Sequence, residues 1–495
     1  MDIVWGFNFV LCFLSVLIEF RRDDSVSHLG IIEKRTHRVL STSHFHPLET
    51  LSLISFIFVN TKFKKKNNMK QKIGIITMGC SKNAVDSERL MAQLKINEFE
   101  IVEDPNEADS LIINTCGFIN PAKEESINTI LEAVALKKEN TVKKVYVAGC
   151  LSERYEFDLK KDIPEVDKYF GTEDYKGIVE ELGGTLKTEL LGERELTTPK
   201  HFAYIKISEG CDNPCSFCAI PLIRGAYRSK SIDDLVTETK SLAAKGVKEL
   251  IIIGQDTTDY GIDIYGKRNL DELLNKLSEV EGIEWIRILY TYPSHFPMEA
   301  IETIASNPKV LNYVDIPLQH ISDNVLKGMR RGITKRRTIE LIETLKEKIP
   351  NLTLRTTFII GFPNETEADF KELCDFVQET KFDRFGVFNY SQEDDTTGYA
   401  LGDPISEDIK IERNNKLMEI QKEISLEKNS SLVGKNINVI VDTLDGDYYV
   451  TRSERDAPEV DGEVLIEKDE NLEIGNIYNV EIIDYNDYDL FAKLS

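Results

Sequence analysis

Positive charge is scarce in this chain. Its 495 residues include 61 lysines and arginines against 85 aspartates and glutamates, a formal net charge of −24 at pH 7. The shortage is strongest in residues 431–495, where 5 basic and 16 acidic residues give −11. A nucleic-acid surface needs cations to neutralise phosphates, so this segment is better suited to a basic protein. Acidity that only aids solubility, with local patches that still contact RNA, remains an open alternative.

A fourth cysteine and a close histidine are missing around the densest group of cysteines. Cys211, Cys215 and Cys218 lie within eight residues, spaced C-x3-C-x2-C, and the nearest histidine is His201, ten residues upstream. A structural zinc site uses four ligands, usually in paired C-x2-C knuckles. Three thiolates can instead hold three irons of a 4Fe–4S cluster and leave the fourth iron open. The spacing therefore favours an iron–sulfur cluster over zinc.

Three further cysteines recur at similar intervals. Cys80, Cys116 and Cys150 lie 36 and 34 residues apart, and each follows an apolar run with strand character. Helical patterns over residues 84–95 and 121–138 separate these runs, which predicts a parallel sheet with crossover helices. Because residues that follow parallel strands share one sheet edge, we expect the three thiols to converge and bind metal. The alternative is that each is a small buried hydrophobe.

The remaining two cysteines are not expected to be ligands. Cys374 lies on an apolar helix face with residues 370, 373 and 377, which predicts a core position. Cys12 belongs to an atypical N-terminal stretch. Two sites built from free thiols indicate a reducing compartment, so we expect a cytoplasmic protein.

Residues 1–68 differ in composition from the rest of the chain. They hold four of the seven histidines and a net charge of +3, whereas the remainder carries −27. Met69 directly precedes the first expected strand, and we favour it as the true start, with residues 1–68 spurious or disordered. Ile3 to Ile18 suggests a membrane anchor but is shorter than the roughly 20 residues that span a bilayer. Asp2 argues against a secretory signal, and no membrane association is expected.

Three domains are expected after this extension, all within an α/β fold class. Residues 69–195 form the parallel α/β sheet domain with the first three cysteines. Residues 200–427 repeat strand and helix six times, which predicts a partial (βα)6 barrel of TIM-like kind. Residues 431–495 contain five short strands, typical of a small OB-like barrel. The barrel strands are expected at Phe202–Ser208, Glu249–Gly254, Trp285–Tyr290, Tyr313–Pro317, Leu354–Ile360 and Phe385–Tyr390.

Polar or glycine-rich segments follow several of these strands, where the catalytic face of such a barrel lies. One alternative is that the glycine-rich segment is only a turn, and that His320, after another strand, is a satisfied surface histidine. The candidate contacts to a cofactor are Gln255, Gly361, Phe362, Pro363 and Tyr390.

The loop from Gly210 to Cys218 resembles the signature of the radical S-adenosylmethionine enzymes. In that family the open iron binds S-adenosylmethionine, and one electron from the cluster releases a 5′-deoxyadenosyl radical that removes hydrogen from unreactive carbons. The resemblance implies S-adenosylmethionine as cofactor, with the protein supplying position and the exclusion of water.

Two three-cysteine sites in one chain resemble the methylthiotransferases, which replace a C–H bond by C–S–CH3. The resemblance covers residues 70–495 and implies two 4Fe–4S clusters. The first, on Cys80, Cys116 and Cys150, would handle the inserted sulfur, and the second, on the C-x3-C-x2-C loop, would make the radical. The last segment resembles a TRAM domain, a module associated with RNA contact that its charge does not favour here.

Within the methylthiotransferases the chain resembles the RimO type, which modifies an aspartate of a ribosomal protein. The resemblance rests on residues 79–88, the cysteine loop with residues 219–221, residues 317–323 and residues 452–462. The tRNA-modifying relatives typically have Gln-Ser-Gly-Ser at positions 319–322. It implies that the substrate is the β-carbon of an aspartate in a basic small-subunit ribosomal protein near the decoding centre, free or on the ribosome. It identifies neither electron donor nor sulfur source. The alternatives are a tRNA adenosine methylthiotransferase and a non-catalytic, metal-stabilised module of the ribosome.

Overall fold

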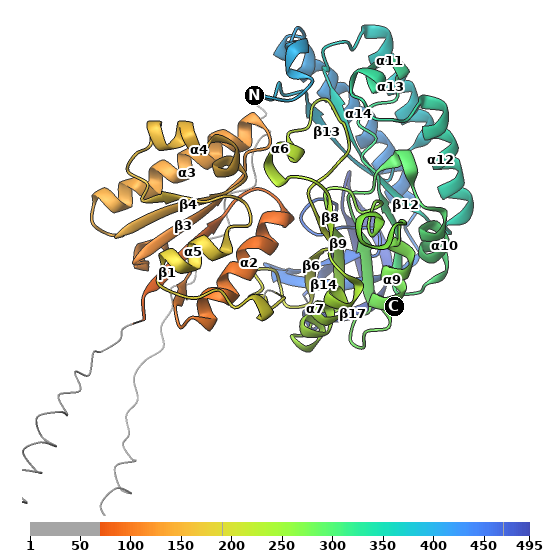
Figure 1. Cartoon of the computed structure of the whole chain (residues 1–495). Helices are drawn as coiled ribbons and strands as arrows, with labels where there is room; N and C mark the ends of the chain where they lie inside the picture. Colours follow the sequence, from red (N-terminus) through yellow and green to blue (C-terminus); the bar gives the residue numbers. More distant parts are fainter. Residues whose placement is uncertain (1–69, 191, 469) are drawn as a thin grey trace, which may run out of the picture. The chain divides into compact units, whose positions relative to one another are not determined.

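The computed structural model describes residues 70–190, 192–468 and 470–495 (Figure 1). The expectations for residues 1–68, Cys12 among them, lie outside the described residues. In the part described, no helix is both long and apolar enough to cross a membrane. Residues 70–495 form one unit that contains three larger sheets.

The first sheet is parallel and five-stranded, with the order β2-β1-β3-β4-β5. Its central strand is buried along its whole length because helices cover both faces (Figure 1). Leu111 packs toward Ile130 of α3, whereas its neighbour Ile112 packs toward Leu90 of α2, the alternation expected of a strand. The predicted parallel sheet with crossover helices is confirmed. Its elements are β1 Lys72–Thr77, α2 Ser81–Ile96, β2 Glu100–Val102, β3 Ser110–Thr115, α3 Asn120–Lys138, β4 Lys144–Gly149, α4 Cys150–Asp162, β5 Lys168–Tyr169 and α5 Tyr175–Glu181.

The second sheet has six parallel strands in the order β6-β9-β10-β11-β12-β13, which confirms the partial barrel. All six strands were expected within a few residues. The first ends at Lys206 rather than Ser208, because Ser208–Glu209 leaves the sheet and pairs with Arg228–Ser229. The strands are β6 Phe202–Lys206, β7 Ser208–Glu209, β8 Arg228–Ser229, β9 Glu249–Ile253, β10 Trp285–Ile288, β11 Val310–Asp315, β12 Thr353–Ile360 and β13 Arg384–Asn389.

Helices follow the barrel strands and cover the sheet (Figure 1). α13 begins with a capping box, in which Thr366 and Asp369 each accept the other's backbone N–H. Cys374 of this helix is half-buried against the barrel core, as expected. The helices are α6 Ile220–Arg224, α7 Ile232–Ala244, α8 Ile262–Tyr265, α9 Leu270–Ser278, α10 Met298–Ser306, α11 Asp323–Gly328, α12 Lys335–Lys348, α13 Glu367–Thr380 and α14 Glu407–Ser430.

The third sheet is a closed five-stranded barrel in the order β14-β15-β16-β18-β17, which confirms the predicted small β-barrel. All five strands were expected from the turn pattern. The domain boundaries themselves, at 69–195, 200–427 and 431–495, stay predictions. The strands are β14 Asn436–Asp445, β15 Tyr448–Ser453, β16 Val464–Glu467, β17 Ile477–Tyr485 and β18 Leu490–Leu494.

The segment between β15 and β16 packs against the interior of the (βα)6 barrel. Ala457 belongs to the same buried cluster as Tyr204 and Tyr313 of the barrel strands. Asp461 accepts a hydrogen bond from the Tyr313 hydroxyl at 2.6 Å, and Asp456 accepts one from Arg384 at 2.6 Å. Part of the acidity of residues 431–495 therefore serves contacts within the chain and is not available to a partner.

Candidate active site

The first three cysteines follow neighbouring strands. Cys80 precedes the first residue of α2, Cys116 comes directly after β3, and Cys150 comes directly after β4. Since β1, β3 and β4 are adjacent and parallel, the three residues lie at one edge of the sheet. Gly79 has a φ of +87° and lies next to the side chain of Cys116. A Cβ at position 79 would lie only 2.9 Å from the Cys116 sulfur, so a larger residue would not fit there. The thiol of Cys116 thus packs against the backbone next to Cys80.

Asn83 ties the three cysteine-bearing loops together. Its side-chain nitrogen donates to the carbonyls of Met78 at 2.9 Å and Thr115 at 3.0 Å, each just before a cysteine loop. Its side-chain oxygen lies 3.6 Å from the sulfur of Cys150 and accepts the thiol hydrogen. One buried amide therefore contacts all three loops.

Burial favours the protonated form of the thiols of Cys116, Cys211 and Cys218. Burial raises the pKa of Cys116 to about 12, and the neighbouring Cys80 and Cys150 raise it further. Burial likewise raises the pKa of Cys218 to about 12 and that of Cys211 to about 11. Metal binding must therefore release protons here and supply the energy that thiolate formation costs.

The donor set bears on which metal group each site fits. Each group offers three free thiols among the described residues. A structural zinc site takes four protein ligands. Three thiolates can hold three irons of a 4Fe–4S cluster and leave the fourth iron open, so this donor set fits such a cluster.

The C-x3-C-x2-C loop connects β7 to α6, and backbone hydrogen bonds to other segments of the barrel hold it in place. Cys211 donates its backbone N–H to the carbonyl of Gly225 at 3.2 Å. Ser216 donates to the carbonyl of Met329 at 2.9 Å and accepts from Gly398 at 2.7 Å. Distant parts of the barrel therefore set the loop conformation.

Two cysteine sulfurs of this loop receive hydrogen bonds. Asn213 donates to the sulfur of Cys211 at 3.4 Å, and Arg331 donates to that of Cys215 at 3.3 Å. The Tyr292 hydroxyl lies 3.6 Å from the same Cys215 sulfur. Such contacts to the sulfurs orient cluster ligands and tune cluster potentials.

The two groups of cysteines meet at α6. Cys150 forms a small buried cluster with Ala219 and Ile223, which directly follow the C-x3-C-x2-C loop. Arg224, at the end of α6, donates to the Cys150 sulfur at 3.5 Å and to the Asn83 side-chain oxygen at 2.6 Å. The sequence predicted two sites; the structure places them next to each other.

Arg224 also belongs to a buried network of four charges. It pairs with Asp86 at 2.8 Å and with Glu209 at 3.2 Å, and Lys206 contacts both carboxylates. Burial alone would raise the pKa of Asp86, but Lys206 and Arg224 hold it well below its usual range. The network joins α2 of the first sheet domain to β6 and the cysteine loop of the barrel.

The candidate cofactor contacts fall into two places. The rings of Phe362 and Tyr390 pack edge to face, with their centres 5.2 Å apart, and Phe217 of the cysteine loop packs against them. Gln255 lies elsewhere and donates to Glu209 at 3.1 Å. The Tyr390 hydroxyl and the Gln255 side-chain oxygen are buried and find no hydrogen-bond partner among the described residues. Both atoms suit a polar cofactor, and their assignment stays a prediction.

The glycine-rich segment is a turn stabilised by Glu365, which accepts the backbone N–H groups of Gly361 at 2.6 Å and Phe362 at 3.3 Å. Gly361 has a φ of +75°, which favours glycine. With those two N–H groups already bonded, any cofactor contact of Gly361, Phe362 or Pro363 would use other atoms of the segment.

His320 is not at the surface. It is fully buried, and its Nδ1 accepts the Ser322 backbone N–H at 3.0 Å. Its Nε2 finds no hydrogen-bond partner in the described part of the chain and lies 4.0 Å from a carboxylate oxygen of Glu365. Burial lowers the pKa of His320 to about 3, so the ring is neutral. The alternative interpretation of His320 as a satisfied surface histidine is wrong.

Sequence reasoning missed Arg224, Arg331, Tyr292 and Asn213. Asn213 lies within the cysteine loop, so its position next to the sulfurs gave a signal that could have been used. The other three reach the cysteines from separate elements, and no local pattern distinguishes them from other buried residues.

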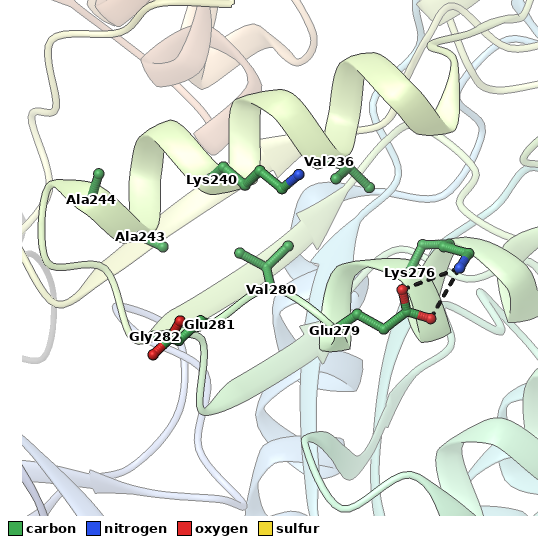
Figure 2. A pocket seen from close by; sticks show the side chains of 9 residues that line it. All are labelled: Val236, Lys240, Ala243, Ala244, Lys276, Glu279, Val280, Glu281 and Gly282. Carbon is green, nitrogen blue, oxygen red and sulfur yellow. Dashed lines mark hydrogen bonds and ion pairs between the residues drawn. The ribbon is translucent and has the colours of Figure 1, made fainter.

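A depression on the outside of the barrel lies between α7 and the end of α9 (Figure 2). Val236, Lys240 and Val280 line it, together with the surface pair Lys276–Glu279. None of the predicted site residues lines it, so it plays no part in the site described above.

The chain matches known families over most of its described length. Residues 205–377 match the Radical SAM superfamily, residues 72–171 match Uncharacterized protein family UPF0004, and residues 433–494 match the TRAM domain. The first two matches each contain one group of three cysteines.

Curated relatives extend the likeness to whole chains. Ribosomal protein uS12 methylthiotransferase RimO of Christiangramia forsetii is 51% identical over 436 residues, 88% of this chain and 96% of the relative. The protein of the same name from Chloroherpeton thalassium is 51% identical over 86% of this chain and 99% of the relative. Among solved structures, the radical S-adenosylmethionine methyltransferase TsrM of Kitasatospora setae has a TM-score of 0.52 at 14% identity, covering 76% of this chain and 79% of its own.

The TsrM likeness shows that the fold is that of a radical S-adenosylmethionine enzyme. At about half identity over nearly the full length of the relatives, the chain belongs to the RimO family of radical S-adenosylmethionine methylthiotransferases.

Proposed function

We propose that this enzyme inserts a methylthio group at the β-carbon of an aspartate in ribosomal protein uS12. The observation that carries the proposal is the meeting of two three-cysteine groups at α6, where Cys150 packs against Ala219 and Ile223. Group transfer to a carbon centre needs the donor and the activated carbon close together. Two adjacent metal groups, one for sulfur and one for radical formation, satisfy that need.

Six cysteines would hold the two 4Fe–4S clusters of the family. When bound with S-adenosylmethionine, these clusters supply the radical and the sulfur, chemistry that no side chain of the chain provides. The first cluster would be held by Cys80, Cys116 and Cys150, and the second by Cys211, Cys215 and Cys218.

The protein's own residues position and shield these groups. Asn83 holds the loops that bear the first three cysteines, and the carbonyl of Met329 holds the second loop. Arg224 contacts both regions. Phe362 and Tyr390 form an apolar wall beside the second loop that excludes water from a reactive radical.

Charge supports a basic protein substrate. The chain carries −24 in total, and opposite charge on uS12 would speed their encounter. Free thiols at all six predicted ligand positions suit a reducing compartment, so a cytoplasmic location is part of the proposal.

Cysteine variants test the division of labour between the two sites. Cys215→Ala should abolish 5′-deoxyadenosine formation while the first site keeps its iron. Cys116→Ala should keep 5′-deoxyadenosine formation but give no methylthio product on uS12. Cys374→Ala, half-buried in α13, is the matched control and should keep both activities. Loss of both clusters, or of neither, in Cys215→Ala would contradict the assignment.

A further inference from the structure

Almost every buried cation of the described chain has a carboxylate partner. Ten lysine or arginine side chains are buried there, and eight of them form ion pairs. Lys82 and Arg331 are the two exceptions among the described residues. The paired cations are Arg89 with Glu238, Arg194 with Glu88, Lys206 and Arg224 with Asp86, Arg287 and Arg452 with Glu249, Lys410 with Asp403, and Arg413 with Glu365.

The two exceptions differ in what they contact. Arg331 donates to the sulfur of Cys215 and to the carbonyl of Pro317, so its guanidinium is hydrogen-bonded. Lys82 is 8% exposed, and its ammonium lies over the ring of Tyr290, 2.9 Å from the ring centre. An aromatic face compensates a buried ammonium only in part, because it accepts none of the three N–H donors as a carboxylate would. Lys82 is thus a buried cation that meets no carboxylate among the described residues.

Lys82 lies between the first group of cysteines and the (βα)6 barrel. It is two residues from Cys80 and precedes Asn83, which contacts Cys150. Val85, one helical turn further along α2 and on the same face, packs into the barrel-interior cluster. Tyr290 follows the carboxyl end of β10, and in such barrels that end is the catalytic face.

We propose that Lys82 binds the side-chain carboxylate of the substrate aspartate. The inference rests on the proposed function and adds a specificity-determining residue to it. A carboxylate that enters this position gains a charge-assisted hydrogen bond without displacing an existing ion pair. Tyr290 holds the ammonium in place before the substrate arrives, which lowers the entropy that binding costs.

Such a contact selects the substrate by charge. A site built around an unpaired cation accepts aspartate and disfavours asparagine, whose amide brings no charge and would leave the ammonium unpaired. An uncharged nucleobase would be disfavoured for the same reason. Lys82 would therefore favour a protein target that carries a carboxylate over a nucleobase target of the same methylthio transfer.

The test compares uS12 carrying the target aspartate with uS12 carrying asparagine there. Binding to the cluster-loaded full chain is measured by fluorescence anisotropy, and turnover by methylthio product. The wild-type enzyme should bind the aspartate form about 10- to 100-fold more tightly, the range of one charged hydrogen bond. In Lys82→Met this ratio should fall to within about threefold of unity, while Lys82→Arg should keep most of it.

Controls separate this role from a structural one. Lys95→Met, on the same helix but exposed and paired with Glu195, should keep the wild-type ratio. 5′-Deoxyadenosine formation without uS12 and the iron content should be unchanged in Lys82→Met. If Lys82→Met loses iron, Lys82→Gln replaces it in the same comparison.

Each outcome decides the inference. An unchanged aspartate-to-asparagine ratio in Lys82→Met would overturn it, and so would a selective loss of S-adenosylmethionine cleavage without uS12, which would assign Lys82 to the cofactor instead. If the wild-type enzyme modifies neither form of uS12, the proposed function itself fails.

Discussion

Arg224→Met should destabilise the protein strongly, because it breaks a buried and electrically balanced network. Arg224 and Lys206 face the carboxylates of Asp86 and Glu209, and all four side chains are at most 8% exposed. Removal of the guanidinium leaves two buried carboxylates against one ammonium. Breaking a buried ion pair in this way costs roughly 3–5 kcal/mol. Arg224→Met also removes the hydrogen bond to Asn83, but this contact is coupled to the ion pairs, so its free energy is not added to the roughly 3–5 kcal/mol.

The assay is thermal unfolding of the cluster-loaded protein, with iron retention as a second readout. At about 2 cal/mol/K per residue over residues 70–495, this cost corresponds to a midpoint lower by roughly 3–6 °C. The double variant Asp86→Asn/Arg224→Met provides the internal comparison, because it leaves Lys206 balanced by Glu209. It should be more stable than Arg224→Met alone, since removal of both partners of a buried pair is far less costly than removal of one.

Two results would contradict this prediction for Arg224→Met. A midpoint of Arg224→Met equal to that of the wild type would mean that water or relaxation compensates the unpaired carboxylates. A double variant less stable than Arg224→Met would mean that the charges do not form one balanced network.

Three further predictions concern neighbouring contacts. Arg331→Met should lower the reduction potential of the cluster at Cys215 and slow 5′-deoxyadenosine formation, because a positive hydrogen-bond donor at the sulfur stabilises the reduced state. An unchanged potential in an EPR-monitored redox titration would contradict this prediction. Arg452→Met should speed limited proteolysis of the C-terminal barrel, because it removes the ion pairs that join β15 to Glu249 of the (βα)6 barrel and to Asp442. Equal cleavage rates would argue that other contacts hold the C-terminal barrel in place. The folded-state pKa values of Asp86 and Glu209 are lowered. The two carboxylates therefore stabilise the fold fully above the ordinary carboxylate pKa of about 4, and this contribution is lost as the pH falls below that value. Scans of the metal-free chain should show a steeper acid loss for the wild type than for the double variant, and parallel curves would count against the assignment.

Local pattern predicted much of the framework. Apolar runs before Cys80, Cys116 and Cys150 predicted parallel strands, and the structure has β1, β3 and β4 there. Strand ends were less accurate: β11 begins at Val310 rather than Tyr313. Val310 and Leu311 are buried by the neighbouring strand and by barrel packing, and neither partner is visible in a local window.

Contacts between distant segments could not be predicted in this way. Arg224 is 74 residues from Cys150 and 138 residues from Asp86, and no periodicity links them. His320 lies 4.0 Å from the carboxylate of Glu365, which is 45 residues further along the chain. The acidic composition of residues 431–495 suggested a surface for a basic partner, yet Asp456 and Asp461 pair with barrel residues. Composition counts charges but does not tell which of them face solvent.

Mass spectrometry after an anaerobic reaction of the cluster-loaded enzyme tests the chemistry and the substrate together. S-adenosylmethionine and a reductant are supplied, with uS12 and unmodified tRNA offered in parallel. We expect a methylthio mass gain on an aspartate of uS12 and none on tRNA. A gain on tRNA alone would keep the chemistry but contradict the substrate, and with it the role proposed for Lys82.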